Sequence, residues 1–175
     1  MTLHQASAFI LALTLTLFAH APATAQQGAA PDALRETFRD WTVQCAKRKD
    51  QSRECEMLQQ VDHEESRNSV LLFSIRINEQ DQPVSVMITP FGLLLSEGVQ
   101  LVVGETVVGR YGFQTCLNNG CIVIAELDKS DIATMRAGAE GQLRAITRNG
   151  EGFGIPVSFW GFSAALDRLL ELDKG

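Results

Sequence analysis

Four cysteines in two closely spaced pairs constrain the fold of this chain more than any other feature. The first pair is Cys45 and Cys55, and the second is Cys116 and Cys121. Four cysteines allow three disulfide connectivities. We favour a bridge within each pair, because the second pair brackets an Asn-Gly dipeptide that suits a tight hairpin turn. Each bridge would then join two neighbouring strands.

A zinc site with four thiolate ligands is the alternative use of these cysteines. The spacings are C-x9-C and C-x4-C, whereas zinc sites are usually built on C-x2-C pairs. The C-x-x-C motif of thiol–disulfide exchange is also absent from the sequence. We therefore expect the cysteines to be structural disulfides, with no metal and no cofactor.

The N-terminus predicts export from the cytoplasm. An uncharged apolar segment covers residues 8–19 and is followed by Ala23-Thr24-Ala25, a small-residue cleavage site. The segment is too short to span a bilayer as a helix, which needs about 20 residues. We expect a signal peptide over residues 1–25, cleaved near Ala25, and a periplasmic or otherwise exported protein. An uncleaved membrane anchor is the alternative.

Charge and length restrict the partners of the mature chain. The signal contains no charged residue, so the chain keeps 15 basic and 21 acidic residues, and 15 minus 21 gives −6. Nucleic-acid binding depends on clustered Lys and Arg, so we expect no nucleic-acid partner. No later apolar run is long enough for a transmembrane helix. The length after residue 25 suits one domain.

Alternation of apolar and polar residues predicts a mainly β, antiparallel sandwich-like or barrel-like domain over residues 38–175. Trp41, Val43 and Cys45 alternate with polar residues, and 69–78 is the strongest strand. We expect residues 26–37 to form a flexible segment, with a short helical turn over 32–37. A short helix is expected near 130–137, with Ser130 as its N-cap.

The C-terminus changes to a helical period. Phe162, Ala165, Leu166, Leu169 and Leu172 recur every three or four residues, which predicts an amphipathic helix. Ser158 or Ser163 could cap this helix. We expect Trp160 to help seat it on the sheet.

The chain resembles the invasion-associated locus B family of bacterial envelope proteins. The matching segments are Trp41-Thr42-Val43-Gln44-Cys45 with Cys55, Thr89-Pro90-Phe91-Gly92 running into Leu95 and Gly98-Val99, Tyr111 with Cys116 and Gly120-Cys121, and Ser158 through Ala165-Leu166. The resemblance implies an exported, envelope-associated β-rich domain. It implies a link to host-cell interaction and no established catalytic residues.

Candidate chemistry is sparse. His63 is the one histidine after the signal, within Asp62-His63-Glu64-Glu65. It could serve a periplasmic hydrolase as base, or bind a divalent cation with the neighbouring carboxylates. Adjacent residues point in different directions, so a solvated loop is the simpler interpretation. We expect no catalytic residues and a binding or structural module whose partner is an envelope or host protein.

The best surface for recognition is the cysteine hairpin and the strand before it. Its candidate residues are Arg110, Tyr111, Leu117, Asn118 and Asn119. A disulfide-constrained tip loses little conformational entropy on binding, which favours recognition. A merely structural hairpin is the alternative interpretation.

Overall fold

The computed structural model describes residues 33–63, 65 and 68–174. The predicted signal peptide and its cleavage site at Ala25 lie outside these residues. All described residues belong to one unit, which begins at Pro31.

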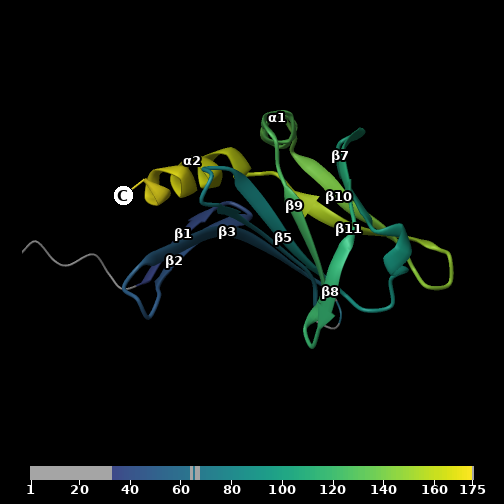
Figure 1. Cartoon of the computed structure of the whole chain (residues 1–175). Helices are drawn as coiled ribbons and strands as arrows, with labels where there is room; N and C mark the ends of the chain where they lie inside the picture. The colour runs from purple at the N-terminus through teal and green to yellow at the C-terminus, as the bar shows by residue number, and fades with distance from the viewer. Residues whose placement is uncertain (1–32, 64, 66–67, 175) are drawn as a thin grey trace, which may run out of the picture. The chain divides into compact units, whose positions relative to one another are not determined.

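Seven antiparallel strands form the larger sheet, in the order β1-β2-β3-β4-β5-β9-β8 (Figure 1). Burial alternates along β2 and β5, as in Trp41, Val43 and Cys45 of β2, which are buried between more exposed neighbours. The strands are β1 (Ala33–Phe38), β2 (Trp41–Lys47), β3 (Arg53–Asp62), β4 (Ser69–Ile77), β5 (Pro83–Thr89), β8 (Phe113–Leu117) and β9 (Gly120–Glu126).

Four further antiparallel strands form the smaller sheet, in the order β11-β10-β6-β7. They are β6 (Val99–Val103), β7 (Thr106–Tyr111), β10 (Glu140–Ile146) and β11 (Gly152–Ser158). Both sheets are open at their edges across the described residues. The mainly β, antiparallel prediction is confirmed, and its sandwich form applies rather than a closed barrel.

The N-terminal expectation is wrong for the residues that the structure describes. Residues 33–37 belong to strand β1, which pairs with β2 along its whole length, from Ala33 opposite Ala46 to Phe38 opposite Trp41. They are therefore neither a helical turn nor a flexible segment. A neighbouring strand satisfies their backbone groups, which no local sequence pattern shows.

Two α-helices and a short 3₁₀ helix complete the described part: α1 (Lys129–Ala137), α2 (Phe162–Asp173) and η1 (Leu95–Glu97). None of them is long or apolar enough to cross a membrane. The cap of α1 is Asp128 rather than Ser130, because its carboxylate accepts hydrogen bonds from the backbone N–H groups of Ser130 and Asp131. The start of α2 has no side-chain cap, so neither Ser158 nor Ser163 plays that role.

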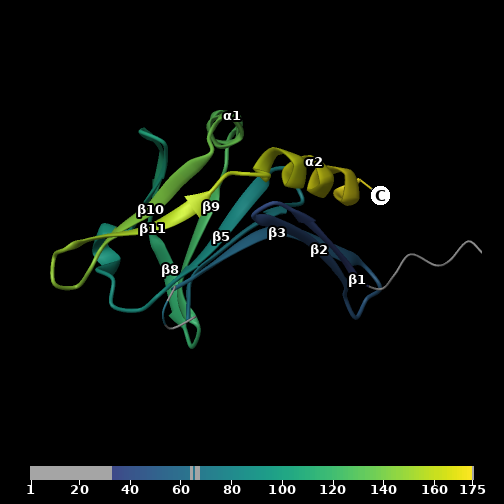
Figure 2. The ribbon, with the colours of Figure 1, turned by 180° about the vertical axis from the view of Figure 1, so that it is seen from behind.

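Helix α2 lies across strands β1 to β4 and closes one side of the core (Figure 1, Figure 2). Its stripe is confirmed: Phe162, Ala165, Leu166 and Leu169 are buried. The ring of Phe162 makes an edge-to-face contact with Trp41, at 5.3 Å between centroids. Trp160 is an exception to the prediction, because 55% of its surface remains exposed.

Both disulfides form as predicted. Cys45 bridges to Cys55 between β2 and β3, and Cys116 bridges to Cys121 between β8 and β9. In each case the two cysteines are opposite one another in the strand register. The described chain contains no free cysteine.

Candidate functional site

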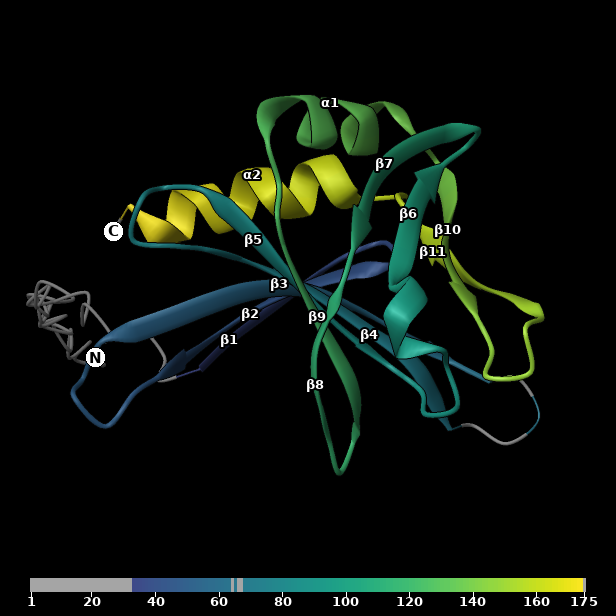
Figure 3. The same cartoon turned by 45° about the vertical axis from the view of Figure 1, so that its right-hand side comes forward.

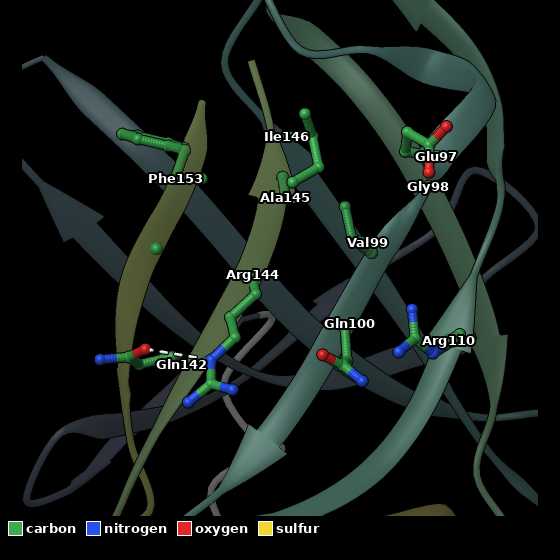
Figure 4. A pocket seen from close by; sticks show the side chains of 12 residues that line it. Glu97, Gly98, Val99, Gln100, Arg110, Gln142, Arg144, Ala145, Ile146 and Phe153 are labelled. Atoms are coloured by element: carbon green, nitrogen blue, oxygen red, sulfur yellow. Dashed lines mark hydrogen bonds between the residues drawn. The ribbon is translucent and has the colours of Figure 1, made fainter. Parts of the chain in front are cut away.

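A cavity of about 420 Å³ opens on the outer face of the smaller sheet (Figure 4). All four strands of that sheet contribute to it, together with the turn before β6. The lining residues are Glu97, Gly98, Val99, Gln100, Arg110, Gln142, Arg144, Ala145, Ile146, Gly152, Phe153 and Gly154. Its size lies within the range of small-ligand sites.

Strand register places two arginines in one row across this face. Arg144 on β10 is opposite Gln100 on β6, and Gln100 is opposite Arg110 on β7. Neighbouring strands are about 4.8 Å apart, so the two arginine backbones are separated by roughly 10 Å. Figure 4 shows the three side chains across the sheet, with the Gln100 amide between the two guanidinium groups. The row presents nitrogen donors to the cavity.

Neither arginine of this row has a carboxylate partner among the described residues. Ion pairs between described residues are instead formed by arginines such as Arg48, Arg76, Arg136 and Arg168. Arg144 makes one contact, donating from Nε to Oε1 of Gln142 at 3.3 Å. Glu97 is the one carboxylate that lines the cavity. Two unpaired guanidinium groups in a protein of net charge −6 mark a place where an anion can bind.

Gly152 and Gly154 of the edge strand β11 line one side of the cavity without contributing side chains. A methyl group added at Gly152 would meet nothing within 4 Å. One added at Gly154 would come within 3.4 Å of the Oε1 atom of Gln142, which is the acceptor for Arg144. A methyl group at position 154 would therefore be in ordinary van der Waals contact with the Gln142 amide. Gly154 is opposite Arg144 in the register, so it extends the row to the sheet edge.

The predicted recognition residues divide between two places. Arg110 lines the cavity, whereas Leu117, Asn118 and Asn119 do not. Those three residues are exposed at the tip of the β8–β9 hairpin, which Figure 3 shows extending away from the smaller sheet. The recognition role of the tip stays a prediction.

Tyr111, the fifth predicted recognition residue, is partly buried and packs against the core with its hydroxyl end, and its recognition role stays a prediction. Its hydroxyl lies against Gly109, at a position where any larger residue would collide with it. The hydroxyl oxygen is buried and has no hydrogen-bond partner among the described residues. Burial, followed by the charges of Asp131 and Asp128, raises the pKa of Tyr111 to about 12. The residue is neutral at physiological pH and acts in packing.

His63 lines a different cavity, of about 430 Å³, with Asp62 and Glu65. Its backbone N–H donates to the carbonyl of Asn68 at 2.9 Å, which holds the start of the loop. Across the described residues, Glu64 being outside them, no three His, Cys, Asp or Glu side chains form a metal-binding group. The structure therefore adds no support for a His63 site.

A third cavity, of about 710 Å³, lies between β3 and β11 and includes Asp40, Gln59 and Ser158. Its polar groups bond to one another. Gln59 donates to the carbonyls of Ser158 and Asp40 and accepts from the backbone N–H of Ser158, while the Ser158 hydroxyl donates to Asp40. These hydrogen bonds join the two sheets, which gives the polar residues of this cavity a structural role. Among the described residues, no such contact between the sheets explains the arginines of the first cavity.

Sequence reasoning missed three polar members of the site: Gln100, Gln142 and Arg144. Each is a polar residue that alternates with buried apolar ones, such as Leu101 and Leu143. The alternation predicts that these side chains lie on an outer face of a sheet. It does not predict which strands are neighbours in that sheet. The row depends on pairing between strands that are distant in the sequence.

These features define a class of protein: a two-sheet β domain with two local disulfides in its larger sheet and an open arginine-lined cavity on its smaller sheet. The chain belongs to the invasion associated locus B (IalB) protein family, whose sequence profile matches residues 41–170.

Individual relatives agree with this family. An invasion protein B homologue of Brucella abortus (strain 2308) is 31% identical over 142 residues, covering 81% of this chain and 82% of the relative. Invasion protein B of Bartonella bacilliformis is 32% identical over 156 residues, covering 87% and 82%. The crystal structure of invasion associated protein B from Bartonella henselae has a TM-score of 0.73 and 31% identity, covering 81% of this chain and 97% of that one.

Proposed function

We propose that this protein is an exported, non-enzymatic binding module of the Gram-negative cell envelope, and that its ligand presents an anionic group to the arginine cavity. The observation that carries the proposal is the pair Arg110 and Arg144, both unpaired and both lining one cavity. Guanidinium groups bind carboxylates and phosphates through paired, charge-assisted hydrogen bonds. The amides of Gln100 and Gln142 add uncharged donors beside them.

Export is supported by the leader-like N-terminus and by the disulfides. Structural disulfides persist in oxidising compartments such as the periplasm. The relatives are named as invasion proteins, and a role in host-cell interaction would operate through the same anion site. The export proposal predicts that N-terminal sequencing of the protein from a periplasmic fraction begins at Gln26. A chain from the cytosol that retains Met1 would overturn it.

Titration with inorganic phosphate, followed by amide NMR of the chain from residue 26 onward, tests the anion site. We expect saturable shifts centred on Gln100, Arg110 and Arg144, with sodium chloride held constant. The R110Q/R144Q variant should weaken phosphate binding by at least about tenfold, because two charge-assisted contacts are lost.

The matched control is R35Q/K174Q, which removes the same charge from β1 and from the residue after α2, outside the cavity lining. It should leave the titration unchanged. Equal weakening by both variants would show a general charge effect, and shifts that are absent in the native chain would overturn the anion site.

A further inference from the structure

The turn before β6 exposes apolar side chains that the fold does not use. Phe91 is 59% exposed, Leu95 48% and Leu94 36%, while Leu93 between them is buried in the core. The short 3₁₀ helix η1 (Leu95–Glu97) has no buried residue. Three large apolar side chains within five residues form an exposed patch of a kind that usually marks an interaction surface. We refer to Phe91, Leu94 and Leu95 as the apolar rim.

Backbone hydrogen bonds hold the apolar rim in place. The N–H of Leu94 donates to the carbonyl of Ile146 at 2.7 Å, and the N–H of Arg148 donates to the carbonyl of Gly92 at 2.9 Å. Figure 3 shows this turn beside the hairpin between β10 and β11. Because these hydrogen bonds already order the backbone of the turn, docking costs little backbone conformational entropy.

The apolar rim is continuous with the arginine cavity. Ile146, which accepts the hydrogen bond from Leu94, also lines the cavity, as do Glu97 and Gly98, which follow Leu95 closely. A ligand that reaches both features therefore has an anionic group and an apolar part next to each other. A lipid at a bilayer surface combines these two properties.

The charges at this end of the smaller sheet favour an anionic surface. Arg110, Arg144 and the exposed Arg148 form no ion pair within the described chain. Glu97 lines the same cavity, and Glu151 lies in the turn between β10 and β11. Exposed basic residues beside apolar side chains are typical of peripheral contact with anionic lipid.

We propose that this end of the domain docks on anionic lipid bilayers, an inference that rests on the proposed anion site. Phe91, Leu94 and Leu95 enter the headgroup region, and Arg110 and Arg144 bind lipid phosphates. A protein ligand with an acidic segment would use the arginines without needing the apolar rim, so the two features can be separated by mutation.

Flotation with lipid vesicles tests this docking. The chain from residue 26 onward is mixed with vesicles of phosphatidylcholine alone, or of phosphatidylcholine and phosphatidylglycerol in equal parts. We expect flotation with the mixed vesicles only. F91S/L95S should reduce it by at least about tenfold, and R110Q/R144Q should also reduce it.

The matched control is V107S/I124S, which removes two apolar side chains of similar exposure, 49% and 47%, from β7 and β9. It should float as the native chain does. F91S/L95S should keep the native phosphate titration, which also verifies that it folds.

The possible failures distinguish the two proposals. If the native chain binds phosphate but does not float with the mixed vesicles, the lipid proposal is overturned and the anion site remains. Flotation that survives F91S/L95S, or that V107S/I124S reduces equally, also overturns it. Loss of phosphate binding in the native chain instead overturns the proposed function on which docking rests.

Discussion

Gln59 is a buried amide whose hydrogen bonds join the two sheets. It is 5% exposed, and its Nε2 atom donates to the carbonyls of Ser158 at 3.1 Å and Asp40 at 3.2 Å. Its Oε1 atom accepts from the N–H of Ser158 at 3.0 Å. Trp41 donates its indole N–H to the same Ser158 carbonyl at 2.9 Å. One side chain on β3 thus satisfies backbone groups at the end of β11.

Replacing Gln59 with Ala should lower the free energy of unfolding by about 1–3 kcal/mol. The substitution leaves the partly buried Ser158 N–H without its partner, and an unsatisfied buried group costs about that much. Urea unfolding followed by tryptophan fluorescence measures the change. The control is Q60A, since Gln60 is exposed and bonds only to Asp62 in the described chain. Equal midpoints for the two variants would contradict the bridging role.

At the scale of elements, α2 depends on one buried stripe. Leu166 is 1% exposed, within a core that also contains Trp41 and Phe73. Leu166→Ala should lower the free energy of unfolding by about 2–5 kcal/mol, because it removes buried methyl groups and leaves a cavity. Asp167→Ala, on the exposed side, removes only the ion pair with Arg136 and should cost less than about 1 kcal/mol. If the two variants lowered the free energy of unfolding by similar amounts in urea, α2 would not be packed on the sheet through Leu166.

Helix α1 should respond to acid through its cap. Hydrogen bonding from Ser130, and then from the Asp131 N–H, lowers the pKa of Asp128 below its ordinary value of 3.8. A lowered folded-state pKa means that the stabilisation is complete above the unfolded value and is lost as the pH falls through the folded one. Asp128→Asn keeps an acceptor for the cap, so it should remain close to native at neutral pH.

Comparison of thermal midpoints along an acid titration checks this effect. The native chain should lose stability below about pH 4 more steeply than the Asp128→Asn variant does. Asp128→Ala should be less stable than Asp128→Asn at neutral pH. Parallel acid curves for the native and Asn forms would show that the carboxylate charge at the cap is not involved.

For the whole molecule, the two disulfides should contribute unequally. Cys45 and Cys55 are 10 residues apart, whereas Cys116 and Cys121 are 5 apart. Chain-entropy estimates give about 2–3 kcal/mol for each bridge, with the larger value for the longer loop. Urea unfolding of C45A/C55A and of C116A/C121A should therefore show the larger loss in the former. A larger loss in the latter would contradict the loop-length argument.

Local patterns predicted much of this fold. The alternation of Trp41, Val43 and Cys45 and the helical spacing of Phe162, Ala165 and Leu166 both describe elements that the structure contains. The segment at 33–37 was misjudged, because β1 is a strand only through its pairing with β2. Propensity in a short segment is weak, and tertiary context decides it.

The sequence by itself indicated the family, the mainly β composition and the terminal helix, and it favoured the disulfide pairs that the structure contains, because each depends on residues close together in the chain or on a periodic pattern. Only the tertiary structure decided that β9 joins β5 in one sheet while β10 joins β6 in the other. That partition places Arg144 beside Gln100 and Arg110, and it forms the cavity. The physical reason is that pairing between distant strands is selected by the packing of both sheets on a common core.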